Sequence, residues 1–250
     1  FINYEDHVTP DRLSEFDADA NKFSTIKSLA ARFDAGELEV HQHMAKSADG
    51  TEVPYFVIHR KGLKPDGSTP TILYGYGGFE ISLKPSYSAT IGKLWLERSG
   101  AYAVANIRGG GEFGPRWHKA ALKTERQRAY DDFIAVGEDL AKRGITSPKH
   151  LGISGGSNGG LLVGAIFTQR PDLLNAVVCR VPLLDMIRYT KLLAGASWAA
   201  EYGDPEDPKM REAILRYSPY QNVFPEKKYP KVFIETSTKD DRVHPGHARK

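Results

Sequence analysis

The pattern of hydrophobic and polar positions changes at about residue 37 of this 250-residue chain. Residues 1–36 are polar and irregular with short alternating pieces, and we expect them to be the end of another unit. From residue 37 onward, short continuous apolar runs are separated by helical patterns, which is typical of a parallel sheet covered on both faces. The chain is therefore predicted to hold one α/β domain over residues 37–250.

Two strands with a hairpin turn between them open this domain, and five apolar runs predict the rest of its sheet. The hairpin pairs residues 38–41 with residues 53–59, and Ser47 to Gly50 supply the turn. The later strands are expected at residues 71–76, 101–107, 151–154, 176–179 and 232–236. The clearest helix is predicted over 130–143, where Phe133, Val136, Leu140 and Ala141 form an apolar stripe.

Composition and charge exclude several classes of function. The net charge is only +3, with both signs interspersed, so nucleic acid is not expected as a partner. No apolar run is long enough to span a bilayer, and the composition is that of a soluble globular protein. The sequence leaves its compartment open between the cytoplasm and the periplasm. The single Cys179 lies in an apolar run and is predicted to be a buried structural thiol. Neither a cofactor nor a metal ion is expected.

A glycine-rich segment provides the strongest chemical signal. A short apolar strand leads into Gly155-Gly156-Ser157-Asn158-Gly159-Gly160, and an apolar helix follows it. The pattern G-x-S-x-G between a strand and a helix predicts a nucleophile elbow that displays Ser157. The alternatives are an ordinary glycine-rich turn or a phosphate cradle at a helix N-terminus. Four glycines around one hydroxyl argue against the first, and the missing lysine of a phosphate loop argues against the second.

A serine nucleophile needs a base and an acid that orients the base. In folds with this elbow the chain order is serine, acid and then histidine. Asp240 and Asp241 follow the strand at 232–236, at the end of a parallel sheet where catalytic groups gather. They could instead cap a helix or lie solvated in a loop. Asp240 is preferred as the acid.

No histidine of the chain fits the role of the base. His244 and His247 follow the acid too closely, and His118 precedes the serine. We expect the base, the last strand and the last helix of the fold to lie beyond residue 250. The strand at 232–236 would then form a sheet edge, and residues 1–250 expressed alone are predicted to be insoluble or inactive.

The donors of an oxyanion hole can also be located in the sequence. One is the backbone N–H of Asn158, the residue after the nucleophile. The second should come from the glycine-containing loop after residues 71–74, where the hydroxyl of Tyr76 is a plausible donor. A packing role for Tyr76 is the alternative.

Four segments together resemble the prolyl oligopeptidase family of serine peptidases, in the same order and with similar spacing. They are residues 74–79 (YGYGGF), 106–112 (NIRGGGE), 155–160 (GGSNGG) and 240–243 (DDRV). The resemblance implies an α/β-hydrolase catalytic domain joined to a seven-bladed β-propeller that admits only short peptides. Residues 1–36 would then be the end of the propeller and a linker.

The resemblance also implies roles for individual residues. Ser157 matches the nucleophile, Asp240 the acid, and Tyr76 with the Asn158 amide the oxyanion donors. Trp198 matches the indole that stacks on the proline ring of the substrate, although burial in the core is its alternative role. The remaining matches are Phe79, Tyr202 and Val243 as pocket walls, Arg242 as the donor to a substrate carbonyl, and Leu183 where the family often carries valine.

The function implied is that of a serine endopeptidase acting on short proline-containing peptides through an acyl-enzyme on Ser157. A flat apolar slot suits proline, whose ring offers area but no donor. Asn158 and Trp198 favour the proline-specific branch over oligopeptidase B-like members, which cleave after lysine or arginine. An esterase or basic-residue peptidase of the same fold and a non-catalytic hydrolase-like domain are the alternatives.

Overall fold

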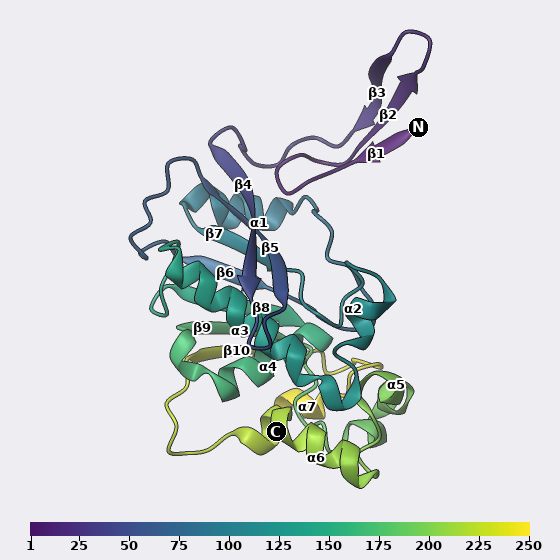
Figure 1. The fold of residues 1–250 in the computed structure, drawn as a ribbon, viewed down its shortest axis with the longest axis vertical. Helices are drawn as coiled ribbons and strands as arrows, with labels where there is room; N and C mark the ends of the chain where they lie inside the picture. The colour runs from purple at the N-terminus through teal and green to yellow at the C-terminus, as the bar shows by residue number, and fades with distance from the viewer.

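The computed structural model describes residues 1–250 and contains two separate β-sheets. A small antiparallel sheet is formed by β1 (Ile2–Tyr4), β2 (Arg12–Asp17) and β3 (Lys22–Ser28). It projects from the main body as an arm (Figure 1). The second sheet has seven strands in the order β10-β9-β8-β6-β7-β5-β4.

All seven strands predicted for the domain are present in the large sheet. β4 (Leu38–Lys46) and β5 (Glu52–Arg60) form the antiparallel hairpin, and β5 also pairs antiparallel with β7. The other neighbouring pairs are parallel. These strands are β6 (Thr71–Tyr74), β7 (Ala101–Ala105), β8 (Leu151–Gly156), β9 (Ala176–Arg180) and β10 (Lys231–Glu235). Since parallel strands end at the same edge, the loops after β6, β8 and β10 converge there.

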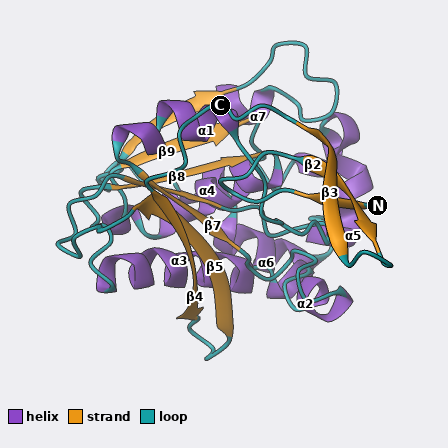
Figure 2. Ribbon diagram, turned by 90° about the horizontal axis from the view of Figure 1, so that it is seen from above, coloured by secondary structure: helices purple, strands orange, loops and turns teal.

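Helices lie on both faces of this sheet, as the sequence predicts. α3 (Gln127–Lys142) and α4 (Asn158–Gln169) cover one face, and α1 (Ala89–Leu94) lies against the other (Figure 2). α3 begins three residues before the predicted start and ends before Gly144 as expected. α4 is buried along nearly its whole length because its side chains are apolar on every side.

The remaining helices are short or lie at the periphery. α6 (Pro208–Tyr217) begins where the Asp207 carboxylate accepts a hydrogen bond from Met210 N at 3.0 Å, with proline at its first position. The others are α2 (Pro115–Lys119), α5 (Ala199–Tyr202) and α7 (Gly246–Arg249). None of the helices combines the length and the apolar character that a bilayer crossing requires.

The main hydrophobic core lies between the sheet and helices α3 and α4, and a smaller hydrophobic cluster lies under α1. The smaller cluster contains Phe33, Leu38, Ile58 and Leu96, so the segment before β4 is anchored to this face. Cys179 is in the main core, and burial raises the pKa of its thiol to about 12, which confirms the predicted structural thiol.

Part of the α1 face is open. A cavity of about 860 Å³ lies over β6, β8 and β9, and its lining includes Tyr74, Tyr102 and Val178. β10 forms the edge of the sheet, as expected, and Phe233 is 63% exposed. The sheet is therefore covered on this side only in part.

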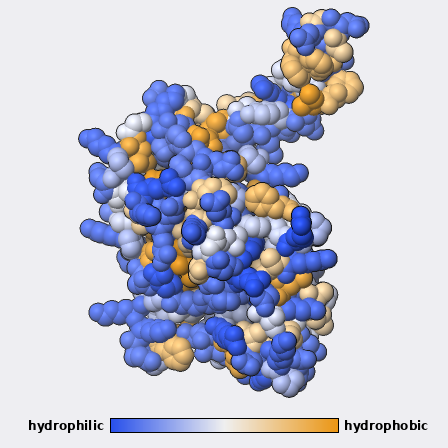
Figure 3. All heavy atoms as spheres, viewed as in Figure 1, coloured by the Kyte–Doolittle hydropathy of each residue, from blue (hydrophilic) through white to orange (hydrophobic).

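The N-terminal arm buries little of its apolar surface. Every residue of β3 is exposed, and the exposed fractions of Phe23 and Leu29 are 59% and 66%. Figure 3 shows apolar atoms on the surface of this arm. The prediction that residues 1–36 do not form a self-contained fold agrees with this exposure, while their assignment to a β-propeller stays a prediction.

Candidate active site

Ser157 occupies a sharp turn between β8 and α4. Its backbone has φ 58° and ψ −118°, a conformation that costs free energy in any residue other than glycine. The strand and helix approach so closely that a Cβ on Gly155 would lie 2.2 Å from Gly159 O. A Cβ on Gly160 would lie 2.8 Å from Arg180 O of the neighbouring strand. The glycines are therefore needed for space, and the predicted elbow geometry is present.

The Ser157 side chain borders a cavity of about 370 Å³. Nine residues line it, namely Tyr76, Phe79, Ile81, Ser157, Leu183, Ser197, Trp198, Tyr202 and Arg242. Trp198 lines the cavity and also packs against the main core, so its position suits either of the two expected roles. Val243, expected as a wall, is 1% exposed and belongs to the main core without lining the cavity. Arg242 is the only charged residue in the lining.

Tyr76 follows β6, and its side chain lines the same cavity as Ser157. Burial raises the pKa of the Tyr76 phenol, and the Ser157 contact and the Arg242 charge oppose that rise only in part. The phenol is consequently protonated at neutral pH. It can donate a hydrogen bond to an oxygen that develops negative charge next to Ser157.

Asn158 is the first residue of α4, and its N–H has no partner within the helix. Its fully buried side chain connects three segments of the chain. The Oδ1 atom accepts hydrogen bonds from Arg126 Nη2 at 2.7 Å and from the Tyr202 hydroxyl at 2.8 Å. The Nδ2 atom donates to the backbone oxygen of Tyr76 at 2.5 Å. The two expected oxyanion donors are thus linked through the Asn158 amide.

Behind the cavity lies an ion pair that the sequence analysis missed. Arg126 Nη1 donates to Glu201 Oε1 at 3.0 Å, and both side chains are at most 5% exposed. Glu201 Oε1 also accepts from Phe79 N at 3.0 Å, and Oε2 lies 2.7 Å from His118 Nε2. His118 is therefore bound to Glu201, which agrees with its rejection as the base. No sequence signal separates the buried Arg126 from Arg128, whose side chain is 43% exposed.

Asp240 lies on the loop after β10 and shapes that loop. Its Oδ1 atom accepts hydrogen bonds from Arg242 N at 3.0 Å and Val243 N at 2.8 Å. The same loop places the Arg242 side chain in the cavity beside Ser157. Asp241 is exposed. Of the two candidate acids, Asp240 is thus the one held in a defined position near this end of the sheet.

None of the eight histidines lines the cavity. His244 Nδ1 accepts from Gly246 N at 2.9 Å, and His247 Nδ1 accepts from Asp185 N at 3.1 Å. Burial lowers the pKa of His247 to about 4. These contacts agree with the expectation that neither residue is the base.

One group of side chains could hold a metal ion. Glu39, His41 and His59 each place a possible ligand atom within 4.8 Å of the others. They lie on β4 and β5, and none of them lines the Ser157 cavity. Glu39 contacts both imidazoles, at 3.4 Å and 3.5 Å. The cluster therefore has no part in the chemistry at Ser157.

Comparison with known proteins places the chain in a family. Residues 85–250 match the prolyl oligopeptidase family. The chain belongs to this family. It is 59% identical over its whole length to an uncharacterised peptidase of Sinorhizobium fredii, and 45% identical to a prolyl endopeptidase of Elizabethkingia miricola. It covers 34% of the first protein and 36% of the second, and so spans about a third of their length.

Solved structures of prolyl oligopeptidase relatives have the same fold. A post-proline cleaving enzyme from Rickettsia typhi superposes with a TM-score of 0.93 at 47% identity. A structure from a study of two prolyl endopeptidases superposes with a TM-score of 0.95 at 44% identity. Each alignment covers 99% of this chain and 36% of the other. The predicted family and the predicted α/β-hydrolase fold are confirmed.

Proposed function

We propose that the complete protein is a serine endopeptidase that hydrolyses short peptides on the carboxyl side of proline, through an acyl-enzyme on Ser157. The observation that carries this proposal is the position of Ser157. Its hydroxyl lies on a strained elbow, beside the Tyr76 phenol and at the border of a largely apolar cavity.

In the proposed reaction, Ser157 Oγ attacks the carbonyl carbon of the scissile bond while its proton passes to a base. The carbonyl oxygen becomes an oxyanion and accepts hydrogen bonds from the Tyr76 hydroxyl and the Asn158 N–H. The base returns the proton to the leaving amine as the C–N bond breaks, and water then hydrolyses the ester in the same way. Asp240 is proposed to orient the base, which we expect to be a histidine outside residues 1–250.

The cavity supports proline as the residue that precedes the scissile bond. Phe79, Leu183 and Trp198 present apolar surface, which suits a ring that has area but no N–H donor. Arg242 can donate to a carbonyl of the substrate. The lining contains no carboxylate that could pair with a lysine or arginine side chain. This absence favours the proline peptidase over the oligopeptidase B-like alternative.

Active-site titration of the complete protein with a fluorophosphonate tests the nucleophile. We expect one equivalent to attach at Ser157, as located by peptide mass spectrometry, and none in the Ser157→Ala variant. An unlabelled parent with an intact fold would favour the non-catalytic alternative.

Turnover of matched peptides with proline or arginine before the scissile bond then tests specificity, and an arginine preference would overturn the role given to Trp198. Turnover of a matched ester substrate tests the esterase alternative, which a preference for the ester over the peptides would favour.

We also propose that residues 1–36 are the last strands of a β-propeller and the linker that follows it. The exposed apolar side chains of the arm, including Phe23 and Leu29, support this because they need a further surface to cover them. A crystal structure of the complete protein tests the proposal. Strands β1 to β3 found outside any propeller blade would overturn it.

A further inference from the structure

Arg126 is a buried cation that makes a hydrogen bond beyond the one that pairs its charge. It directly precedes α3, and its side chain is 1% exposed. A buried charge must be paired, and Glu201 supplies the opposite charge. A guanidinium that only neutralised a carboxylate could present both of its ends to it in a two-point contact. Here one end reaches Glu201, whereas the other donates to the neutral amide of Asn158.

The contact with Asn158 fixes which way its amide points. Oδ1 receives two donors, Arg126 Nη2 and the Tyr202 hydroxyl. The donor side of the amide consequently points to the Tyr76 backbone oxygen. Asn158 carries one expected oxyanion donor on its backbone, and Tyr76 carries the other on its side chain. The guanidinium therefore lies one contact away from the first donor residue and two from the second.

We propose that Arg126 is a positioning residue that sets the relative placement of the two oxyanion donors. This inference rests on the proposed peptidase function. Arg126 does not line the substrate cavity, so it does not contact the substrate directly, and its shortest route to the oxyanion donors runs through Asn158. Its influence should appear when the oxyanion forms and should be absent when a peptide merely occupies the proline pocket.

The informative variant is Arg126→Lys in the complete protein. Lysine keeps the positive charge opposite Glu201, but its single ammonium cannot reproduce a fork that spans Glu201 and Asn158. We expect kcat/KM for a proline peptide to fall about 10- to 100-fold, mainly in kcat, because misplaced donors stabilise the transition state poorly. Arg128→Lys is the matched control, since the Arg128 side chain is 43% exposed and pairs with Glu125. Its kcat/KM should stay within about twofold of the parent.

Two inhibitors distinguish a positioning role of Arg126 from a general disturbance of the site in the Arg126→Lys variant. A peptide aldehyde that ends in proline forms a tetrahedral adduct with the serine and places an oxygen at the donors. The product peptide with a free carboxylate occupies the pocket without forming that adduct. For Arg126→Lys, the inhibition constant of the aldehyde should rise in parallel with the loss of kcat/KM, while that of the product stays within about twofold. An equal loss of affinity for both inhibitors would overturn the proposal.

A double-mutant cycle with Asn158→Ala tests whether Arg126 affects kcat/KM through the side-chain amide of Asn158. This variant keeps the backbone N–H and removes the amide that Arg126 contacts. If Arg126 acts through the amide, Arg126→Lys should change kcat/KM by less than about twofold in the Asn158→Ala background. The same fold-change in both backgrounds would contradict the proposal.

Failure of this inference can be told apart from failure of the proposed function. A parent protein that does not react with a fluorophosphonate overturns both. A parent that reacts and turns over proline peptides, together with an Arg126→Lys variant as active as the Arg128→Lys control, overturns the role of Arg126 alone.

Discussion

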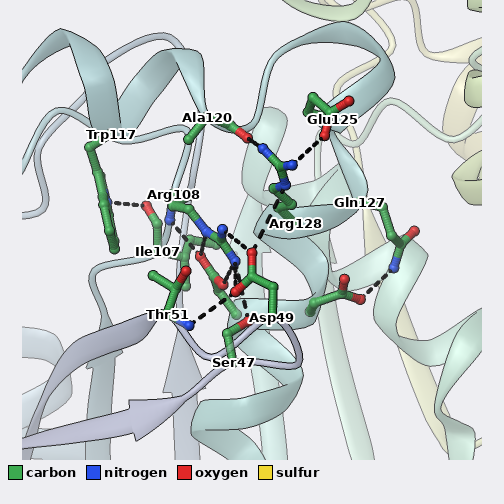
Figure 4. A network of polar contacts seen from close by, with 12 residues as sticks. Ser47, Asp49, Thr51, Ile107, Arg108, Trp117, Ala120, Glu125, Gln127 and Arg128 are labelled. Carbon is green, nitrogen blue, oxygen red and sulfur yellow. Dashed lines mark hydrogen bonds and ion pairs between the residues drawn. The ribbon is translucent and has the colours of Figure 1, made fainter.

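The guanidinium of Arg108 and the carboxylate of Asp132 form a buried two-point ion pair. Arg108 Nε lies 2.9 Å from Asp132 Oδ2, and Nη2 lies 2.6 Å from Oδ1. The same guanidinium contacts Asp49 and Ser47 in the turn between β4 and β5 (Figure 4). Arg108 therefore joins the loop after β7, helix α3 and the hairpin. This explains why an arginine stands within the 106–112 segment although it takes no part in the cavity.

Replacing Arg108 with methionine should destabilise the protein strongly. The change leaves Asp132, which is 0% exposed, as an uncompensated buried charge. We expect a loss of about 3–5 kcal/mol in the free energy of unfolding, measured by urea denaturation of the complete protein. Arg170→Met removes a more exposed arginine paired with Asp172, and should cost about 1 kcal/mol or less. Similar losses for the two variants would contradict a dominant role of burial.

Tyr76→Phe should lower kcat with little change in KM. The variant keeps the ring and removes only the hydroxyl of a residue that lines the cavity together with Ser157. Loss of one oxyanion donor costs about 100- to 1,000-fold in kcat. Steady-state kinetics with a proline peptide measure the effect. Tyr74→Phe makes the same change in a residue that lines the other cavity, and should leave kcat nearly unaltered. A parental kcat in Tyr76→Phe would mean that the residue serves only in packing.

Trp198→Ala should remove much of the preference for proline. The indole supplies the broadest apolar side chain in the cavity lining, and its loss removes on the order of 2 kcal/mol of contact with the substrate ring. We expect kcat/KM for a proline peptide to fall about 30-fold, mostly through KM. Trp198→Phe keeps an aromatic surface and should lose less. An unchanged ratio of kcat/KM values for matched proline and alanine peptides would place Trp198 outside the specificity pocket.

His247 should make the stability of the protein depend on pH below neutrality. Burial lowers its pKa from 6.5 to about 4, so the unfolded chain binds its proton more readily than the folded one does. The stabilising effect is complete above pH 6.5 and is lost as the pH falls towards 4. The loss amounts to about 3 kcal/mol, since each pKa unit corresponds to about 1.4 kcal/mol.

Urea unfolding between pH 4 and pH 7.5 measures this dependence. The charged neighbours of His247 are Asp185, Lys250 and His244. Asp185 has a pKa lowered to about 2 and therefore stays ionised over this range. His247→Asn offers an acceptor in place of Nδ1 and does not titrate, so its stability should vary less with pH. An equally steep variation in the variant would assign the effect to other groups.

The features that sequence reasoning located are those encoded by local pattern. The hairpin pattern and the five apolar runs together predicted every strand of the large sheet, and the glycines around Ser157 predicted its backbone geometry because they are needed for close approach. Strand ends were less accurate: β6 stops at Tyr74 instead of residue 76, and β7 at Ala105 instead of residue 107. In both cases apolar residues continue into loops that bring side chains towards the site or the core.

The features that escaped sequence reasoning depend on tertiary contacts. Arg126 and Glu201 have no distinctive neighbours in the sequence, and only the folded chain shows that each is buried against the other. Val243 adjoins Arg242 in the sequence, yet the loop turns its side chain into the core while Arg242 enters the cavity. The family resemblance implied a place in the site for both residues, because a motif match does not show which way each side chain points.

The backbone conformation at residue 157 has a consequence for how this domain evolves. A left-handed φ of 58° would suit glycine better than the residue that is present. If a homologous protein no longer needed the hydroxyl, replacing Ser157 with glycine would therefore stabilise its fold. Serine in this conformation fits the proposed role as nucleophile, and a homologous chain with glycine in its place would be a candidate for a protein of the same fold without that activity.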